Sequence, residues 1–229
     1  MAIVLCIETS GRNCSVAVAA DDTLLSLREE SSEHFAHAEK LHLFIRDVMK
    51  EAGRELAELT AIGVSRGPGS YTGLRIGVSA AKGLCLALDI PLVSYPVPEV
   101  LAFQMRASFP DAMLYVPMID ARRMEVYTAS YDPRMAVMEP IRAVVLDDSF
   151  FLRTETPAVY GGDGAEKAAG WKASGRIFFP CEPSAATGCV LAMEAIRADR
   201  VEDLAYFEPF YLKDFITGRP AGTIPGGAS

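Results

Sequence analysis

The sequence predicts an α/β protein built as two lobes that repeat one another loosely. Its first 30 residues alternate apolar strands with short polar turns, which is typical of an antiparallel meander. Segments with helical spacing of apolar residues then alternate with short apolar strands. A similar order of strands and helices returns in the second half, so we expect the two halves to be related.

Strand and helix patterns fill the first half. Strands are predicted over residues 3–7, 15–20, 23–29, 61–65 and 92–95. Helices are predicted over residues 33–52, 55–59 and 71–88. Ser32 can cap the first of these helices and Gly53 can end it. A glycine-rich turn at 66–75 opens the last one, and Pro91 stops it.

A helix over residues 98–107 is expected to link the lobes. Strands follow over residues 113–120, 124–131, 141–146 and 158–160, and helices over 165–173 and 185–198. We therefore divide the chain into a first lobe (1–100), a second, reduced lobe (101–217) whose end is able to pack back on the first, and a flexible tail (218–229).

Composition excludes several classes of protein. The chain has 229 residues, half of them hydrophobic and 23% charged, which are the proportions of a folded globular protein with a sizeable core. It carries 22 basic and 30 acidic residues, a formal net charge of −8. Because it also lacks a run of Lys and Arg, we expect no autonomous binding of nucleic acid.

The cysteines and the apolar segments indicate a compartment. There are five cysteines and no CxxC pair, so neither a disulfide framework nor a zinc site is expected. The apolar start of the chain is too short for a signal peptide and has no basic flank. No stretch of 18 apolar residues occurs, so no membrane span is expected. These features predict a cytoplasmic protein.

Two loops of small and polar residues are candidates for holding a phosphate. Glu8, Ser10 and Gly11 follow the first strand, and Gly67 and Gly69 precede a helix whose backbone N–H groups could hold an anion. Neither loop is a P-loop or a Rossmann fingerprint. Tight turns and close helix packing would explain the same glycines, so both interpretations stay open.

Other chemistry-bearing residues give weaker signals. Asp120 opens a charged turn with Arg122 and Arg123, which could contact a nucleotide or form a simple hairpin. His37 and His42 lack the spacing of a metal pair, and no HExxH motif occurs. No GxSxG motif or other nucleophile with its base is evident. We therefore expect no metal and no catalytic residue.

The segment RGPGSYTGLRIGVSAAKGLCLALDIPLVSYP, residues 66–96, is similar to the signature of the TsaB (YeaZ) family. Supporting matches across nearly the whole chain except the tail are IETSGRNCSVAVA, HAEKLHLFI, IDARRMEVY, GGDGA and PFYLK. The resemblance implies a two-lobed actin/hexokinase-like (ASKHA) fold with a reduced second lobe.

The resemblance also implies a division of labour. A TsaD-like transferase carries the metal and moves the threonylcarbamoyl group from threonylcarbamoyl-AMP to adenine 37 of tRNA. A TsaB protein is its required, non-catalytic partner, without a cofactor of its own. A TsaE-like ATPase joins the two, and TsaB alone forms a homodimer through the same face of its first lobe.

Departures from the transferase pattern agree with that implication. In TsaD-like proteins two histidines four residues apart hold the metal, but Leu41 stands four residues after His37. Glu8 occupies a position where the family commonly has aspartate. The candidate vestigial phosphate loops comprise Glu8, Ser10, Gly11, Gly67, Gly69, Asp120, Gly161 and Gly162.

The helices over 33–52 and 71–88 carry more apolar residues than one buried face needs, which predicts a surface for a partner or a second copy. That predicted interface comprises His37, Leu41, Ile45, Leu74, Arg75, Val78 and Ala81. The alternative is that these side chains face the lobe's own sheet.

A rival function, a small ASKHA-type kinase or nucleotide hydrolase, would need Glu8 and Asp120 as its acids. A peptidase, in turn, would need a metal pair or a nucleophile that the sequence lacks.

Overall fold

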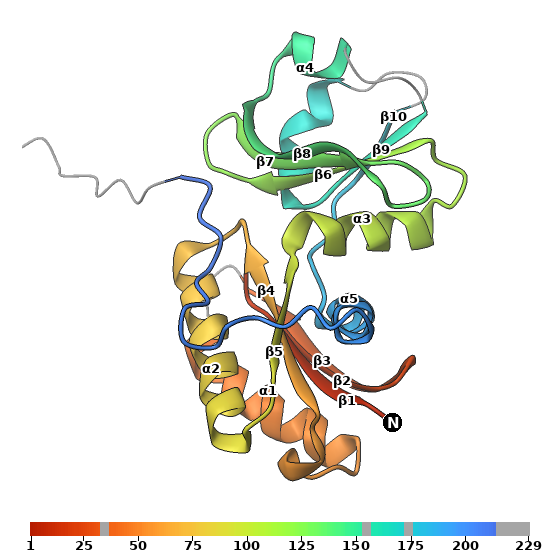
Figure 1. Cartoon of the computed structure of the whole chain (residues 1–229). Coiled ribbons are helices and arrows are strands. Elements are labelled where there is room, and N and C mark those ends of the chain that lie inside the picture. The colour runs from red at the N-terminus through yellow and green to blue at the C-terminus, as the bar shows by residue number, and fades with distance from the viewer. Residues whose placement is uncertain (33–36, 153–156, 172–175, 214–229) are drawn as a thin grey trace, which may run out of the picture.

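The computed structural model describes residues 1–32, 37–152, 157–171 and 176–213. It consists of two halves, each built on a five-stranded sheet (Figure 1). The first sheet contains β1 (Ile3–Glu8), β2 (Asn13–Ala20), β3 (Thr23–Ser31), β4 (Ala61–Gly67) and β5 (Leu92–Pro96). The second contains β6 (Leu114–Asp120), β7 (Glu125–Tyr131), β8 (Val137–Val145), β9 (Ala158–Gly161) and β10 (Arg176–Phe179).

The two sheets have the same topology. Their strand orders are β3-β2-β1-β4-β5 and, read from the other edge, β8-β7-β6-β9-β10. In each sheet the first three strands pair antiparallel, and the fourth strand pairs parallel with the first and the fifth. The prediction of two related α/β halves is therefore confirmed.

Helices cover both faces of the first sheet (Figure 1). On one face, α1 (His37–Glu51) lies on β2 and β3, and α2 (Tyr71–Leu88) lies mainly on β4. On the other face, α5 (Ala185–Arg197) lies across β1, β2 and β5. Because β1 is covered on both sides, all six of its residues are buried, which explains its continuous apolar sequence.

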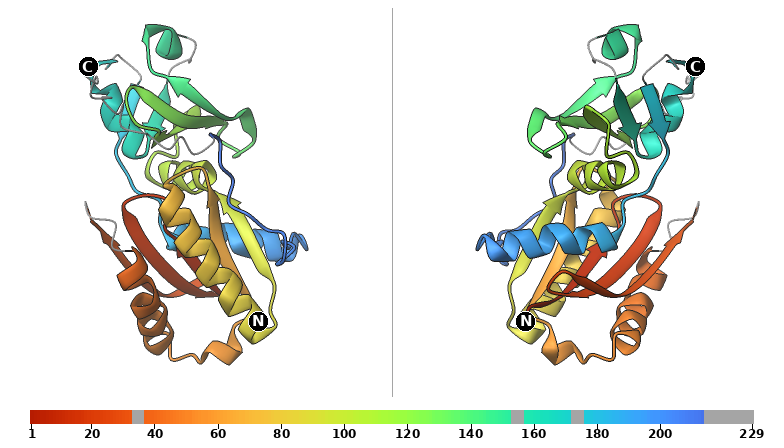
Figure 2. Two further views of the ribbon diagram at one scale, coloured as in Figure 1. Left: turned by 90° about the vertical axis from the view of Figure 1, so that its left-hand side faces the viewer. Right: turned by 90° about the vertical axis from the view of Figure 1, so that its right-hand side faces the viewer.

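The second half has shorter covering segments. They are α3 (Val97–Ser108), α4 (Asp148–Leu152) and the 3₁₀ helix η2 (Asp163–Trp171); a further 3₁₀ turn, η1 (Leu56–Glu58), lies in the first half. α3 lies between the halves and contacts β6 (Figure 2). In the part of the chain that the structure describes, no helix is long and apolar enough to cross a membrane.

Each sheet is followed in the sequence by a helix that packs on the other sheet. α3 follows the first sheet and packs on the second, whereas α5 follows the second sheet and packs on the first. After α5 the chain returns along α2 and β5 as an extended segment, residues 201–213, which we call the strap. The predicted lobe division at residue 100 falls within α3 and stays a prediction.

Several predicted elements are corrected. The segment expected as an α-helix over 165–173 is the 3₁₀ helix η2, and β8 begins at Val137 rather than at residue 141. Sequence reasoning missed α4 and β10, since segments of five and four residues are too short to display a period. The expected helix start at residues 33–36 and the tail over 218–229 lie outside the described residues.

Candidate functional site at the junction of the halves and on two helices

The loop between β1 and β2 lies at the junction of the two halves, and its acid is fully buried. One oxygen of Glu8, Oε1, accepts hydrogen bonds from the backbone N–H of Ser10 at 2.7 Å and from the hydroxyl of Ser65 at 2.9 Å. Burial raises the pKa of this carboxyl, although these hydrogen bonds oppose the shift. Because Glu8 is fully buried, the loop presents no exposed carboxylate. Among the described residues Glu8 forms no ion pair.

The glycine-rich turn packs directly on this loop. A Cβ added to Gly69 or Gly73 would lie 2.5 Å from the Ser10 carbonyl oxygen or 2.0 Å from the Thr9 carbonyl oxygen, respectively, which no real side chain tolerates. The backbone N–H of Ser70 donates to the Ser10 carbonyl at 2.6 Å, and that of Gly73 donates to the Ser70 hydroxyl at 3.3 Å. These contacts favour close helix packing over anion binding as the reason for the glycines.

A side chain from the second half of the sequence closes the first loop. The Oε2 atom of Glu182 lies 2.9 Å from where a Cβ of Gly11 would be, and the nearby Arg12, through its guanidinium and its backbone, acts to lower the pKa of this carboxyl. Burial and then the nearby Asp163 raise the pKa of Glu182 to about 7. A carboxyl group of the chain itself therefore lies against the backbone of the loop, where a phosphate would have to bind.

The loops of the second half are also occupied by protein groups. Asp120 pairs with Lys167 at 2.5 Å, and its backbone N–H donates to Asp163 at 2.8 Å. Burial raises the pKa of Asp163. A Cβ on Gly161 would lie 2.3 Å from the Met105 sulfur, and one on Gly162, whose φ is +119°, would lie equally close to a carbonyl. Packing thus accounts for both glycines.

A cavity of about 330 Å³ lies beside Glu182. It is lined by Asn13, Glu29, Ser31, Gln104, Cys181, Glu182 and Ser184. Burial raises the pKa of Cys181 to about 12, which keeps its thiol protonated. Sequence reasoning missed Glu182, since nothing local indicates that it meets Gly11 from 171 positions away. Among the described residues no group of three or more His, Cys, Asp and Glu side chains is arranged to hold a metal ion.

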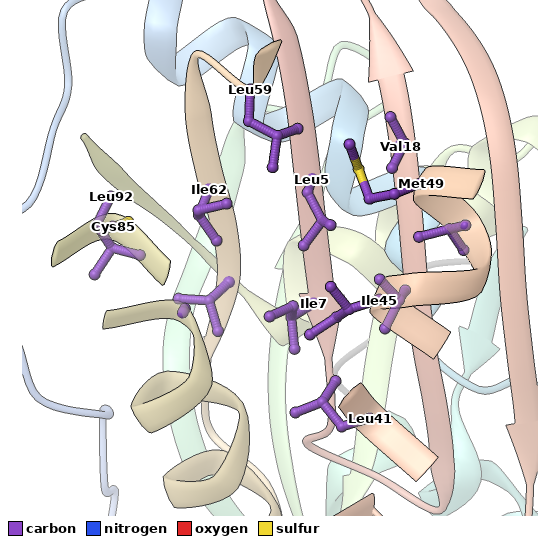
Figure 3. Close-up of a cluster of buried hydrophobic side chains, with 14 of the residues drawn as sticks. Leu5, Ile7, Val18, Leu41, Ile45, Met49, Leu59, Ile62, Cys85 and Leu92 are labelled. Atoms are coloured by element: carbon purple, nitrogen blue, oxygen red, sulfur yellow. The ribbon is translucent and has the colours of Figure 1, made fainter. Parts of the chain in front are cut away.

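Nearly all of the predicted interface residues lie in the core of the first half. Figure 3 shows Leu41 and Ile45 directed at the sheet beside Ile7. The exposed fractions are 1% for His37, 0% for Leu41, 5% for Ile45, 1% for Leu74, 5% for Val78 and 0% for Ala81. Burial lowers the pKa of His37, whose Nε2 lies 2.9 Å from the carbonyl of Gly11. Arg75 alone of the seven is exposed.

Other apolar residues of the two helices lie outside the face that packs on the sheet. We call this the outer helix surface; it comprises Ala38, Leu43, Ile76, Ala80, Gly83, Leu86 and Ala87, of which Leu86 is 78% exposed and Leu43 49%. The earlier assignment of Leu41, Ile45, Leu74, Val78 and Ala81 to the surface is corrected, because all five are buried in the chain itself, and all but Leu74 belong to the core cluster of the first sheet. That these helices meet a partner stays a prediction.

Comparison with known proteins identifies related sequences. Residues 23–151 match the family model described as TsaD, tRNA N6-adenosine threonylcarbamoyltransferase. The tRNA threonylcarbamoyladenosine biosynthesis protein TsaB of Bacillus subtilis (strain 168) is 32% identical over 143 residues, which are 60% of this chain and 58% of that protein. The TsaB protein of Escherichia coli (strain K12) is 33% identical over 128 residues, 56% of this chain and 54% of the relative.

A solved structure extends the likeness to most of the chain. YeaZ from Pseudomonas aeruginosa superposes with a TM-score of 0.79 at 26% identity, over 93% of this chain and all of that one. In sequence, by contrast, the chain spans little more than half the length of the curated relatives it matches.

Proposed function

The chain belongs to the TsaB (YeaZ) family of TsaD-related proteins, and from that premise we propose that it is the non-catalytic partner of a TsaD-like transferase. Its fold is the two-lobed, actin/hexokinase-like one that the resemblance implied. In the proposed role it supports transfer of the threonylcarbamoyl group from threonylcarbamoyl-AMP to adenine 37 of tRNA. This places it in the cytoplasm, where the tRNA is.

One observation carries the non-catalytic part of the proposal: the β1–β2 loop is filled by the chain's own groups. Glu8 is buried, and the Glu182 carboxyl lies against Gly11, 2.9 Å from where a Cβ of that residue would be. A kinase or hydrolase of this fold would need that loop open to a nucleotide. The metal position offers no better chemistry, because Leu41 stands one turn after His37 and both side chains are buried.

The outer helix surface supports the partner-binding part. It is mainly apolar on α2, it extends to the adjacent α1 at Leu43, and small residues such as Ala80 and Gly83 would let another helix pair approach closely. We propose that this surface binds the transferase, that it forms a homodimer when the transferase is absent, and that a TsaE-like ATPase joins the complex.

Reconstituted transfer tests the function. Transferase, ATPase, threonylcarbamoyl-AMP synthase, ATP, threonine, bicarbonate and unmodified tRNA are incubated with and without this chain. We expect modified tRNA only when the chain is present, and none from the chain alone. Full modification without it would refute the accessory role, and calorimetric binding of ATP to the isolated chain would favour the kinase or hydrolase reading.

A matched pair of variants tests the surface. Val78→Asp, the substitution that the sequence suggests, would disrupt the core, because Val78 is only 5% exposed. Gly83→Arg is sharper, since nothing lies within 4 Å of an added Cβ and arginine favours helix. We expect it to abolish capture of the transferase. Val190→Arg, on the exposed side of α5 across the sheet, should bind like the wild type; equal binding by both variants would refute the surface.

A further inference from the structure

The strap gathers cations that are scattered in the sequence. The backbone N–H of Phe210 donates to the carbonyl of Arg66 at 2.7 Å, and Arg75 donates to the Tyr211 hydroxyl at 3.3 Å. Two residues further on, Lys213 forms an ion pair with Glu125, the residue that closes the β6–β7 turn. Three strap residues within a stretch of four therefore link α2 and β4 of the first half to a turn of the second.

That turn carries two arginines in an unusual backbone conformation. Arg122 and Arg123 have φ values of +68° and +50°, a left-handed region that side chains other than Gly and Asn seldom adopt. Both are exposed, and neither guanidinium forms an ion pair among the described residues. Glycine or asparagine would fit the turn with less strain, so folding alone does not explain two arginines here.

We call Arg66, Arg75, Arg122, Arg123 and Lys213 the junction patch; all five are exposed. Its nearby acids are mostly engaged: Glu125 pairs with Lys213, and Asp120 pairs with Lys167. Glu99 and Glu208 interact electrostatically with Arg66 and Arg75, respectively, but form no ion pair with them. In a chain of net charge −8, four guanidinium groups near the strap therefore form no ion pair with a carboxylate among the described residues.

Aromatic rings accompany these cations. The Arg75 guanidinium lies 4.2 Å from the centre of the Tyr71 ring, and the Tyr71 and Tyr211 ring centres are 4.8 Å apart. Phe210 is 42% exposed and Tyr206 84% exposed on the same strap. Arginines that can bind phosphates, beside rings that can stack on bases, form a surface suited to RNA.

We propose that the junction patch binds the phosphate backbone of the tRNA while the chain is held by the transferase. This inference rests on the proposed function for the identity of the RNA. The patch is small, so the chain alone binds RNA weakly and the contacts count when the transferase holds the tRNA nearby.

Binding of labelled, unmodified tRNA to the assembled complex tests the proposal by fluorescence anisotropy across a salt series. In Arg122→Asn/Arg123→Asn both charges are lost and asparagine suits the left-handed backbone, so the melting temperature should be unchanged or higher. We expect about tenfold weaker binding and a salt dependence lower by about two phosphate contacts. The control, Arg28→Asn/Arg197→Asn, removes two exposed arginines from β3 and α5 and should bind like the wild type.

Equal affinity of the wild type and the Arg122/Arg123 variant would overturn the proposal, as would an equal loss in the control. A variant that keeps its tRNA affinity but loses the transferase or the ATPase would show that the patch binds an acidic protein instead. The same titration on the chain alone at low salt separates the two proposals: dependence on the patch without any association with the transferase would refute the proposed function and keep the RNA contact.

Discussion

The two halves share one topology but differ in the helices that cover it. Between the third and fourth strands the first half has α1, of 15 residues, where the second has α4, of five. Between the fourth and fifth strands, α2 has 18 residues where η2 is a 3₁₀ segment of nine. A sheet of this topology can therefore form with much shorter helices between its strands. The long helices of the first half thus exceed what its fold requires.

The halves also fill their interiors differently. In the first half, glycines let α2 lie close to the β1–β2 loop. In the second, rings replace helix length: the Phe151 ring lies 5.0 Å from that of Trp171 and 5.4 Å from that of Tyr160. The first half therefore relies on long helices packed on its sheet, whereas the second relies on a cluster of aromatic rings.

Among the variants that test this contrast, Phe151→Ala should lower the stability most, because it removes the centre of the aromatic cluster. Phe151 is 1% exposed, and truncation of such a buried ring typically lowers the free energy of unfolding by about 4 kcal/mol. Urea unfolding measures the loss. Ile177→Ala, on neighbouring β10 and 39% exposed, should lose far less; equal losses would mean that the cluster does not support the second half.

Gly73→Ala tests the close packing of α2 on the β1–β2 loop in the first half. The added methyl would lie 2.0 Å from the Thr9 carbonyl oxygen, so α2 must shift, and we expect a loss of about 3 kcal/mol in the free energy of unfolding. Gly83→Ala on the same helix meets no atom within 4 Å and should instead stabilise the protein by about 0.5–1 kcal/mol. Similar values for the two variants would refute close packing as the reason for the glycine.

Glu182→Gln tests the burial of Glu182 at the junction of the halves through the pH dependence of stability. The pKa of Glu182 is about 7 in the folded chain, above its ordinary value of 4.5, so folding favours the protonated form. The free energy of unfolding should therefore fall as the pH rises from about 4.5 through 7, and the variant should lack this part of the decline. Above pH 7 we expect the variant to be more stable by about 1 kcal/mol, after allowance for solvent screening. Parallel pH profiles of the two proteins would contradict this.

Lys213→Ala should have the smallest effect. Its ion pair with Glu125 joins the strap to the second half, but both side chains are partly exposed, and such a pair contributes less than about 0.5 kcal/mol. Calorimetry should show a melting temperature within about 1–2 °C of the wild type. A large drop would mean that the strap, rather than the crossed helices α3 and α5, holds the halves together.

The sequence predicted what local patterns determine. Alternation and helical spacing located the meander, and α2 was predicted with its observed bounds, Tyr71–Leu88. The same spacing correctly grouped Leu74, Val78 and Ala81 on one face, but periodicity does not say whether a sheet or a partner covers that face. Contacts between distant segments, such as Glu182 on Gly11 or Lys213 with Glu125, depend on the completed fold and leave no local pattern.

The crossing of α5 onto the first sheet sets an order for folding during synthesis. One face of that sheet, with Val4, Cys6 and Val93, is covered by Cys189 and Ala192, which the ribosome makes about a hundred residues after β5. Until α5 emerges, the first half leaves an apolar strip exposed, although α1 and α2 already cover its other face. The nascent chain is thus expected to need protection from aggregation at that stage and to complete both halves in one late, cooperative step.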